Sequence, residues 1–497
     1  MALQPRRCTL MIRTLIASLI CVLAACPAQA AESPRDRHSL RNELELAERW
    51  LAAQRAYDRV PGLSAAIVHD QELLWSGASG HADLAARRPA QADTIYGICS
   101  ISKLFTGIAV MQLRDRGELT LDQPLAELLP WFRLPDGSSS GSGFGAGPEV
   151  TLRNVLSHSA GLPRESDMPY WMGPDFDFPT REQVRELLAG QEALYPADRY
   201  YQYSNLGLTL AGEVVAEVSG QDYEDYVRRH ILAPLGLNDT DTGFPEDRRA
   251  ERVATGYGFP GREAGYPPMP RYDTRGITPA AGFTSTALDL ARFASWQFRL
   301  LGGAPEEVLR PDTLREMQRV EWMDWDWSAA RGLAFGVYRI GERTLSGHAG
   351  DCPGFNTRIF LDPVSRYAVI ALANRNATDV DGYAVRLFDI LEAGGTPADA
   401  ATAAAAPDYS AYVGSFDARP WSGEDLVFRW ENSLAMVSLP TMDPLKDMVK
   451  LKHIDGDRFR TVRSDGEAGH EVRFRRDAEG RVSHLEYHAL AWPRLEP

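Results

Sequence analysis

Ser100 and Lys103 are the residues of this sequence whose types and spacing first indicate chemistry. They form a Ser-x-x-Lys tetrad at the predicted start of a buried helix that carries Phe105 and Ile108 inward. Residues three apart share one face of an α-helix, so Lys103 can reach Ser100 Oγ and accept its proton if burial removes the lysine charge. Free N–H groups at a helix start also favour the negative charge of acyl transfer. The tetrad therefore predicts nucleophilic catalysis through Ser100, although the pattern alone is common by chance.

A Ser-Lys nucleophile needs a second proton-carrying group and a strand edge that holds the acyl chain. Tyr203 and Asn205 stand just before a predicted helix. The Tyr203 phenol can act as general base or acid if its pKa is depressed beside Lys103, and the Asn205 amide can dock a substrate carbonyl or side-chain amide. His348-Ala349-Gly350 follows a predicted strand and ends in glycine, which lets a substrate backbone approach closely.

Two further features have more than one interpretation. His158 is a second candidate base, but bracing or capping a turn is the commoner role for a histidine in such a segment. The aromatic-rich loop Asp167–Phe178 either walls a substrate cleft or fills a surface between helices.

The apolar patterns place strands at both ends of a long first region and helices between them. Helical periodicity covers residues 40–57, a stretch from about 100, and 150–156, 206–218, 223–232 and 287–298; strand patterns cover 62–69, 72–77, 333–340, 344–348, 355–361 and 367–372. We predict an α+β fold, with an antiparallel sheet built from both ends of the main domain and a helical subdomain packed on it. A site is expected in the crevice between the two parts.

The chain divides into four predicted segments. Residues 1–30, with a basic start and an apolar run too short to span a bilayer, form a signal peptide ending in Ala28-Gln29-Ala30. Alternatively, residues 1–25 are a lipoprotein signal, which leaves Cys26 as a lipidated N-terminus. The main domain covers 41–396 and an Ala/Gly/Pro-rich linker covers 397–407. Residues 408–497, with short alternating runs separated by turns, predict a small antiparallel β-meander or barrel.

Charge and cysteine usage limit the partners. The net charge of −15 becomes −18 without the signal segment, which argues against nucleic acid or an anionic membrane surface. We expect an exported protein, periplasmic or secreted, that contacts a membrane only through a lipid on Cys26. The ten histidines are scattered without metal-ligand spacing, so no metal or cofactor is predicted. Cys99 and Cys352 either pair in an oxidising compartment or remain free.

The three motifs, in this order, resemble those of the penicillin-recognising serine hydrolases, which include class C β-lactamases, D-alanyl-D-alanine carboxypeptidases, D-aminopeptidases and β-lactamase-like esterases. The resemblance extends over residues 41–396. Further segments that look like the framework of that superfamily are Leu156–Leu162, Pro234–Leu237, Gly282–Leu290 and Gly350–Phe355.

The resemblance implies a role for each motif residue. Ser100 is the acylated nucleophile, Lys103 and Tyr203 share proton transfer, and Asn205 contacts the substrate. His348 and Gly350 bind the substrate, with His348 in the place that lysine holds in β-lactamases. The backbone N–H groups of Ser100 and Asp351 form the oxyanion hole.

The resemblance also bears on three other features. It makes His158 structural. It implies a Cys99–Cys352 disulfide, because cysteines in corresponding places pair across the site in some carbapenem-hydrolysing enzymes of this fold. The C-terminal domain resembles the lipocalin-like or small-barrel appendages of some of these hydrolases. It is either a lid or specificity module that shapes the cleft, or a stability or dimerisation domain.

Two departures from the Lys-Thr-Gly form shape the expected activity. His348 is less reliably charged than lysine at neutral pH, and Ala349 has no hydroxyl. Both changes weaken recognition of a substrate carboxylate. We expect a serine hydrolase that acts through an acyl-enzyme on esters, amides or peptides, including those with D-amino acids. The alternatives are a β-lactamase or low-molecular-weight penicillin-binding carboxypeptidase and, more remotely, an inactive ligand-binding homologue.

Overall fold

The computed structural model describes residues 40–134, 149–188, 191–260, 265–393, 407–420 and 423–495. The predicted signal segment with Cys26, and all of the predicted linker except residue 407, lie outside these ranges. Within them, no helix is both long and apolar enough to cross a bilayer.

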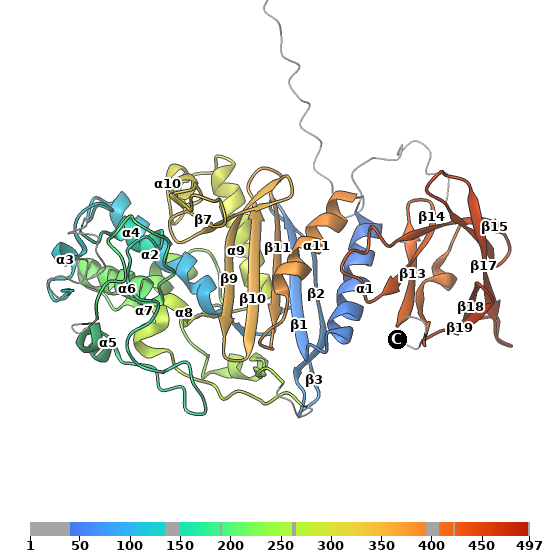
Figure 1. Cartoon of the computed structure of the whole chain (residues 1–497), viewed down its shortest axis with the longest axis horizontal. Coiled ribbons are helices and arrows are strands. Elements are labelled where there is room, and N and C mark those ends of the chain that lie inside the picture. Colours follow the sequence, from blue (N-terminus) through green and yellow to red (C-terminus); the bar gives the residue numbers. More distant parts are fainter. Residues whose placement is uncertain are drawn as a thin grey trace, which may run out of the picture.

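A nine-stranded sheet forms the centre of the main domain (Figure 1). Its strands are β1 (Gly62–His69), β2 (Glu72–Asp83), β3 (Arg88–Pro89), β6 (Trp322–Met323), β7 (Ala330–Arg331), β8 (Gly336–Ile340), β9 (Arg343–Cys352), β10 (Phe355–Asp362) and β11 (Tyr367–Ala373). The strand order is β3-β2-β1-β11-β10-β9-β8-β7-β6. β1 pairs antiparallel with β11 from Leu63↔Ala373 to His69↔Tyr367. Both ends of the main domain therefore build one sheet, which confirms the predicted α+β architecture.

The central strand β1 is apolar along its length because both faces of the sheet are covered. Leu63, Ala65 and Ile67 point into the core on one face, and Ala66 and Val68 point into the core on the other. A strand that is buried on both faces has a nearly continuous run of apolar residues, and β1 has such a sequence.

A helical layer covers the face that carries Ala66 and Val68 (Figure 1). Its helices are α2 (Ser102–Asp115), α3 (Leu125–Leu128), α4 (Leu152–Leu156), α5 (Arg181–Leu188), α6 (Asn205–Ser219), α7 (Tyr223–Val227), α8 (Thr278–Ala281), α9 (Ala287–Leu301) and α10 (Pro311–Met317). A short two-stranded sheet, β4 (Tyr96–Gly97) with β5 (Thr284–Ser285), pairs the segment before α2 with the segment before α9. The sequence patterns missed α5, α10 and the β6–β7 hairpin, and the stretch predicted as helix over 223–232 becomes π-helical from Arg228 to Leu232.

Helices α1 (Arg41–Tyr57) and α11 (Val380–Ala393) cover the opposite face of the sheet. The C-terminal domain packs on the far side of these two helices (Figure 1). Trp50 in α1 is fully buried and donates a hydrogen bond from Nε1 to the carbonyl of Thr441 over 3.1 Å. The sheet and two helices thus separate the C-terminal domain from the helical layer.

The C-terminal domain is a nearly closed barrel. Its strands are β12 (Gly414–Asp417), β13 (Glu424–Trp430), β14 (Ser433–Leu439), β15 (Val449–Asp455), β16 (Arg458–Val462), β17 (Ala468–Arg476), β18 (Val482–Tyr487) and β19 (Leu490–Pro493). They follow each other in sequence order, and a bridge between Phe416 and Arg494 links the first strand to the end of the last. Aromatic and aliphatic side chains, Phe459 and Phe474 among them, fill the interior. The barrel form of the prediction is confirmed.

Candidate active site

A strained turn presents Ser100 just before α2, within the 3₁₀ turn Cys99–Ile101. Cys99 has a φ of +52°, a left-handed conformation that is uncommon for a residue with a side chain. The turn is held on both sides: Ile98 N–H donates to the Phe283 carbonyl over 2.9 Å, and Thr357 Oγ1 donates to the Ile98 carbonyl over 3.2 Å. The surrounding structure therefore fixes this conformation, which is how strained residues persist at functional sites.

Lys103 is completely buried next to Ser100. Its Nζ lies 2.9 Å from Ser100 Oγ, 2.7 Å from Asn205 Oδ1 and 2.7 Å from the Ala280 carbonyl oxygen. Burial lowers the pKa of the Lys103 ammonium well below its ordinary value, an effect that the nearby Glu165 carboxylate opposes. The expected loss of charge on Lys103 is therefore supported by its surroundings.

The three contacts of Lys103 orient its amine. The Asn205 Oδ1 and Ala280 oxygens can only accept hydrogen bonds, so each takes one N–H from the amine. In the neutral form the remaining tetrahedral position of Nζ, which faces Ser100 Oγ, carries the lone pair. A neutral Lys103 is thus set to accept the proton of Ser100.

Tyr203 contacts the same hydroxyl from the other side. Its OH donates to Ser100 Oγ over 2.8 Å, and Lys103 Nζ lies 4.9 Å from the centre of the phenol ring. Burial raises the pKa of Tyr203, so the condition set from the sequence, a pKa depressed beside Lys103, is not met in this arrangement. A neutral lysine supplies no charge to stabilise a tyrosinate, and Tyr203 is a proton donor in the resting site.

His158 positions Tyr203 rather than acting on the substrate. Its ring stacks on the Tyr203 ring with centroids 4.4 Å apart, and its Nδ1 accepts the Ser204 N–H over 3.1 Å. Burial and the nearby Lys103 lower the pKa of His158, which keeps the ring neutral. Of the two interpretations of this residue, the bracing one describes these contacts.

Glu165 and Tyr170 are site residues that the sequence did not reveal. Asn205 Nδ2 donates to Glu165 Oε1 over 2.5 Å, and the Tyr170 hydroxyl donates to Glu165 Oε2. The carboxylate thereby fixes which way the Asn205 amide faces, with its oxygen on Lys103. The Glu165 side chain is 20% exposed and therefore also accessible from the cleft. No local pattern signals this role, because Glu165 lies 40 residues before Asn205.

The segment His348–Gly350 lies within strand β9, not after a strand as predicted. A Cβ on Gly350 would come within 2.3 Å of the Ile98 carbonyl oxygen and 3.1 Å of Cys99 Cβ. The glycine therefore permits close packing against the chain's own Ser100 turn. This packing holds β9 against the turn that carries Ser100, and Ser100 and Asp351 line one cleft. The Asp351 carboxylate accepts a hydrogen bond from Asn376 Nδ2 over 3.1 Å.

His348 is neutral and set back from the surface. It is 7% exposed, its Nδ1 lies 2.6 Å from the Ala349 carbonyl oxygen, and its ring centre lies 6.2 Å from that of Tyr203. Burial lowers the pKa of His348 well below its ordinary value, and the nearby Lys103 lowers it further. The residue therefore supplies no fixed positive charge for a carboxylate.

A cleft of about 770 Å³ opens at Ser100. Its charged lining residues are Arg164, Glu165 and Asp351. Its apolar wall comes from Trp171, Met172, Phe176, Phe259, Pro267, Met269 and Pro353. From the aromatic loop, Trp171 and Phe176 thus wall the cleft, whereas Tyr170 and Phe178 are buried in the core.

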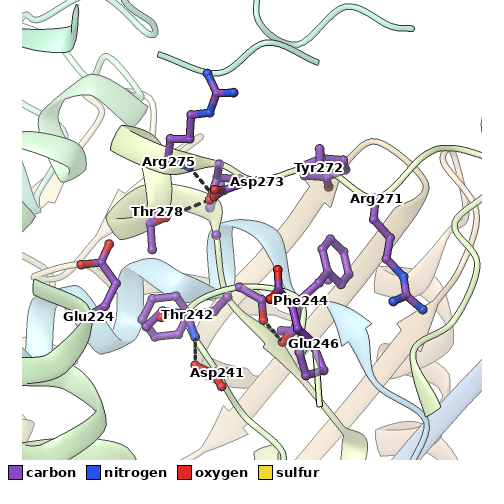
Figure 2. A pocket seen from close by; sticks show the side chains of 18 of the residues that line it. Glu224, Asp241, Thr242, Phe244, Glu246, Arg271, Tyr272, Asp273, Arg275 and Thr278 are labelled. Carbon is purple, nitrogen blue, oxygen red and sulfur yellow. Dashed lines mark hydrogen bonds between the residues drawn. The ribbon is translucent and has the colours of Figure 1, made fainter. Parts of the chain in front are cut away.

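A second cavity, of about 970 Å³, is lined by Thr242, Phe244, Tyr272 and several charged residues (Figure 2). Cys352 lines both cavities, but Ser100 lines only the first. Among the residues that the structure describes, no group of three or more His, Cys, Asp or Glu side chains is placed to hold a metal ion.

Comparison with known proteins gives the family. Residues 47–392 match the Beta-lactamase family, which is more than half of the chain. The chain belongs to the beta-lactamase family. A human protein described as beta-lactamase-like 1 is 30% identical over 354 residues, which cover 67% of this chain and 65% of that protein. Beta-lactamase-like protein 2 of Dictyostelium discoideum is 28% identical, over 60% of this chain and 53% of that protein. The chain thus spans less than two thirds of these relatives.

Solved structures agree with this assignment. The octameric penicillin-binding protein homologue from Pyrococcus abyssi has a TM-score of 0.61 at 22% identity and covers 90% of this chain and 99% of its own. D-amino acid amidase from Ochrobactrum anthropi SV3, complexed with L-phenylalanine amide, has a TM-score of 0.56 at 25% identity and covers 71% of this chain and all of its own. This beta-lactamase-family chain is therefore a member of the penicillin-recognising serine hydrolases, as the sequence motifs indicated.

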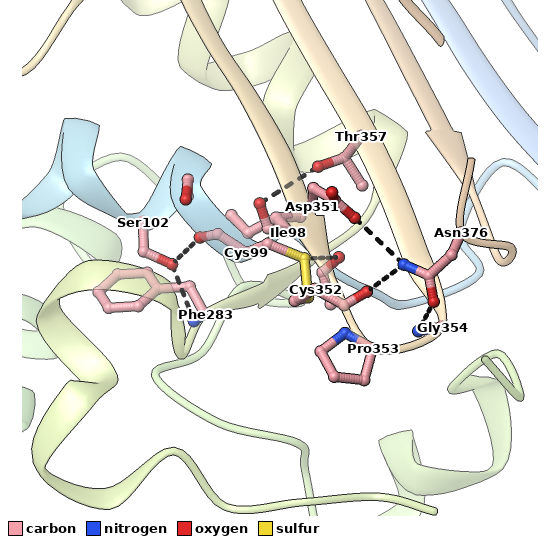
Figure 3. Close-up of a disulfide and its surroundings, with 12 residues drawn as sticks. Ile98, Cys99, Ser102, Phe283, Asp351, Cys352, Pro353, Gly354, Thr357 and Asn376 are labelled. Carbon is pink, nitrogen blue, oxygen red and sulfur yellow. Dashed lines mark hydrogen bonds between the residues drawn. A yellow bond between two sulfur atoms is a disulfide. The ribbon is translucent and has the colours of Figure 1, made fainter. Parts of the chain in front are cut away.

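The expected disulfide is present in this family member (Figure 3). Cys99 and Cys352 pair with a Cα–Cα distance of 5.7 Å and a sequence separation of 253. The bond joins the residue before Ser100 to the residue after Asp351. It therefore ties together the two backbone segments that were predicted to form the oxyanion hole.

Proposed function

We propose that this protein hydrolyses amides and esters of amino acids through an acyl-enzyme on Ser100. The observation that carries the proposal is the position of Ser100 Oγ, 2.9 Å from the Lys103 amine and 2.8 Å from the Tyr203 hydroxyl. One neighbour can take the proton of the nucleophile and the other can give a proton to the leaving group.

Acylation begins when Ser100 Oγ attacks the substrate carbonyl. Lys103 takes the serine proton as the new C–O bond forms, because its lone pair faces that hydroxyl. The Tyr203 hydroxyl then donates its proton to the departing amine or alcohol, and the extra proton on Lys103 restores Tyr203. Water attacks the acyl-enzyme by the same route in reverse, which releases the acid and regenerates Ser100.

The backbone N–H groups of Ser100 and Asp351 are proposed to stabilise the negative oxygen formed in each step. Their proximity depends on Gly350, which lets β9 pack against Ile98, and on the Cys99–Cys352 disulfide. Both features hold these donors before the substrate arrives, and such preorganisation is what makes an oxyanion hole effective.

The charges in the cleft support an acyl group with a free amino group. Glu165 and Asp351 offer two carboxylates near Ser100. The neutral His348 and the methyl side chain of Ala349 offer little to a carboxylate of the kind that β-lactams carry. The name of the similar D-amino acid amidase points to the same class of substrate.

The first test compares substrates on one preparation. Phenylalanine amide and alanine p-nitroanilide, each in D and L form, are incubated with the wild type and with Ser100→Ala, and penicillin is added to separate samples. We expect hydrolysis of at least one aminoacyl substrate by the wild type only, and an acyl mass on Ser100 after acid quenching. Penicillin consumption or a lasting penicillin adduct, without aminoacyl hydrolysis, would instead identify a β-lactamase or a penicillin-binding carboxypeptidase.

We also propose that the protein is exported. The Cys99–Cys352 disulfide supports this proposal, since disulfides persist mainly in oxidising compartments. N-terminal sequencing and mass analysis of the mature protein test it: cleavage after Ala30 indicates a secreted form, and a lipid on Cys26 indicates an anchored form. A mature protein that retains residues 1–30 would contradict export by either signal.

A further inference from the structure

Arg164 places a positive charge at the edge of the active-site cleft. Its guanidinium carbon lies 4.9 Å from the centre of the Tyr203 ring, and the side chain lines the same cleft as Ser100. The side chain is 60% exposed, and its acidic neighbour is Glu165, with Arg164 Nε 3.3 Å from Glu165 Oε1. Solvent screens this ion pair on its Arg164 side, so a ligand can replace the Arg164 contact at modest cost. The guanidinium donates no hydrogen bond of good geometry to any described residue, and its N–H groups remain available.

Arg164 and Glu165 contact different residues of the catalytic machinery. Arg164 is stacked over Tyr203, which gives its proton to the leaving group in the proposed mechanism. Glu165 instead contacts Asn205, whose amide is proposed to dock the acyl part. A leaving group held at Tyr203 would thus meet Arg164, and an acyl group held at Asn205 would meet Glu165, while in the resting site the two side chains lie 3.3 Å apart.

No other cation in the described part of the cleft lining can bind an anion at this end. Lys103 and His348 are both buried, with their pKa values lowered by burial, and neither lines the cleft. Arg164 thus takes the place of the positive charge that His348 does not provide. A guanidinium also suits this task because its planar fork binds both oxygens of a carboxylate.

We propose that Arg164 binds the carboxylate of a leaving amino acid, so that dipeptides with both termini free are the preferred substrates. This inference rests on the proposed aminoacyl hydrolase function. The N-terminal residue acylates Ser100 with its ammonium near Glu165. The peptide C–N bond breaks, the departing nitrogen takes the Tyr203 proton, and the second amino acid leaves with its carboxylate on Arg164. Water then releases the first amino acid, so one dipeptide and one water give two amino acids.

The test measures a preference within one protein. Alanyl-alanine and its C-terminal amide, alanyl-alaninamide, are compared in all D and L combinations, with alanine p-nitroanilide as a substrate whose leaving group carries no carboxylate. For the wild type we expect kcat/KM for the dipeptide to exceed that for its amide by about tenfold or more, mainly through a lower KM. In Arg164→Gln this ratio should fall to about one, and Arg164→Lys should restore part of it.

Arg339→Gln is the matched control, since Arg339 is an exposed arginine paired with Glu342 on the β8–β9 turn and does not line the cleft. This control should keep the wild-type ratio. A wild-type ratio near one, or a ratio unchanged in Arg164→Gln, would overturn the role of Arg164 while aminoacyl hydrolysis continues. Absence of hydrolysis of every aminoacyl substrate would instead overturn the proposed function itself. If Arg164→Gln fails to fold, the dipeptide-to-amide ratio of kcat/KM is compared between the wild type and Arg164→Lys. A wild-type ratio near one, or an equal ratio in both proteins, would then overturn the role of Arg164.

Discussion

At the scale of single residues, burial determines the roles in this site. Lys103 and Tyr203 contact one hydroxyl, yet burial changes their pKa values in opposite directions: it lowers that of the amine and raises that of the phenol. Burial thus favours the neutral form of both groups, one able to accept a proton and the other able to donate one. The pair separates the base and acid roles without any charged group touching Ser100.

The pH dependence of activity should follow Lys103. Only the unprotonated amine can accept the Ser100 proton, so kcat/KM should rise with pH as Lys103 loses its proton. Because burial lowers its pKa, that rise should occur well below the ordinary lysine value of about 10.4. A pH–rate profile checks this. His348→Gln should leave the midpoint of the rise in place; a midpoint that moves with this change would assign the ionisation to His348.

Glu165→Gln should weaken the use of substrates with a free amino group. The change keeps the shape of the side chain but removes its charge, and hydrogen bonds to charged groups contribute about 1.5–3 kcal/mol. We expect kcat/KM for phenylalanine amide to fall by roughly 10- to 100-fold relative to its N-acetylated form. Glu342→Gln, at a fully exposed glutamate, is the control. An equal loss on both substrates would show that Glu165 acts only by orienting Asn205.

At the scale of elements, the site depends on how closely β9 packs against the turn before α2. The prediction from sequence ended this strand at His348, and the residues that follow, Gly350, Asp351 and Pro353, are of types common in turns. The structure continues the strand to Cys352, because the residues from Gly350 to Cys352 pair with β10. Position 350 is glycine because the Ile98 carbonyl leaves no room for a side chain there. A glycine required by crowding looks the same in the sequence as a glycine required by a turn.

Gly350→Ala should therefore reduce catalysis more than stability. The added methyl group meets the Ile98 carbonyl and must push the Ser100 turn away from β9. Misplacement by about 1 Å can cost on the order of 100-fold in rate, and we expect a loss of kcat of that order. Gly243→Ala, where no atom lies within 4 Å of the new Cβ, should retain activity. Comparable activity of the two variants, with unchanged melting temperatures, would contradict the packing argument.

The catalytic motifs were readable from sequence because each depends on local spacing. Ser100 and Lys103 lie on one helical turn, and Tyr203 and Asn205 flank the N-cap Ser204 of α6. Arg164 and Glu165 were not found, because a loop brings them to the site and loops have no periodicity. The raised pKa of Tyr203 was also missed, since the burial of a single side chain follows from packing that no short pattern encodes.

At the scale of the whole molecule, the C-terminal barrel is placed to support the fold and not to cover the cleft. Its β13 and β14 pack against α1 on the face of the sheet opposite the helical layer (Figure 1). Of the two roles considered for this domain, a lid within the same chain does not fit this placement. The barrel instead completes the apolar core behind the sheet.

Phe428→Ala tests this view of the barrel. Phe428 is fully buried in the core shared by α1, α11 and β13. Removing the ring should lower the free energy of unfolding by about 3–5 kcal/mol. The kcat of the folded variant should stay at the wild-type value, because the sheet lies between this core and Ser100. Denaturant unfolding and steady-state kinetics measure both quantities, and a large loss of kcat in a stable variant would favour a functional role for the barrel.

The disulfide also determines how the chain carries mechanical load. Cys99 and Cys352 are 253 positions apart, so the whole helical layer between them forms a covalently closed ring. A force applied to the two ends of the chain passes along β1 and β2, through the sulfur bridge, and on to β10 and the barrel. At about 3.4 Å per residue the bridge removes roughly 850 Å of extensible length. Lys103 and Tyr203 lie inside the ring, where such a pull exerts no tension on the backbone.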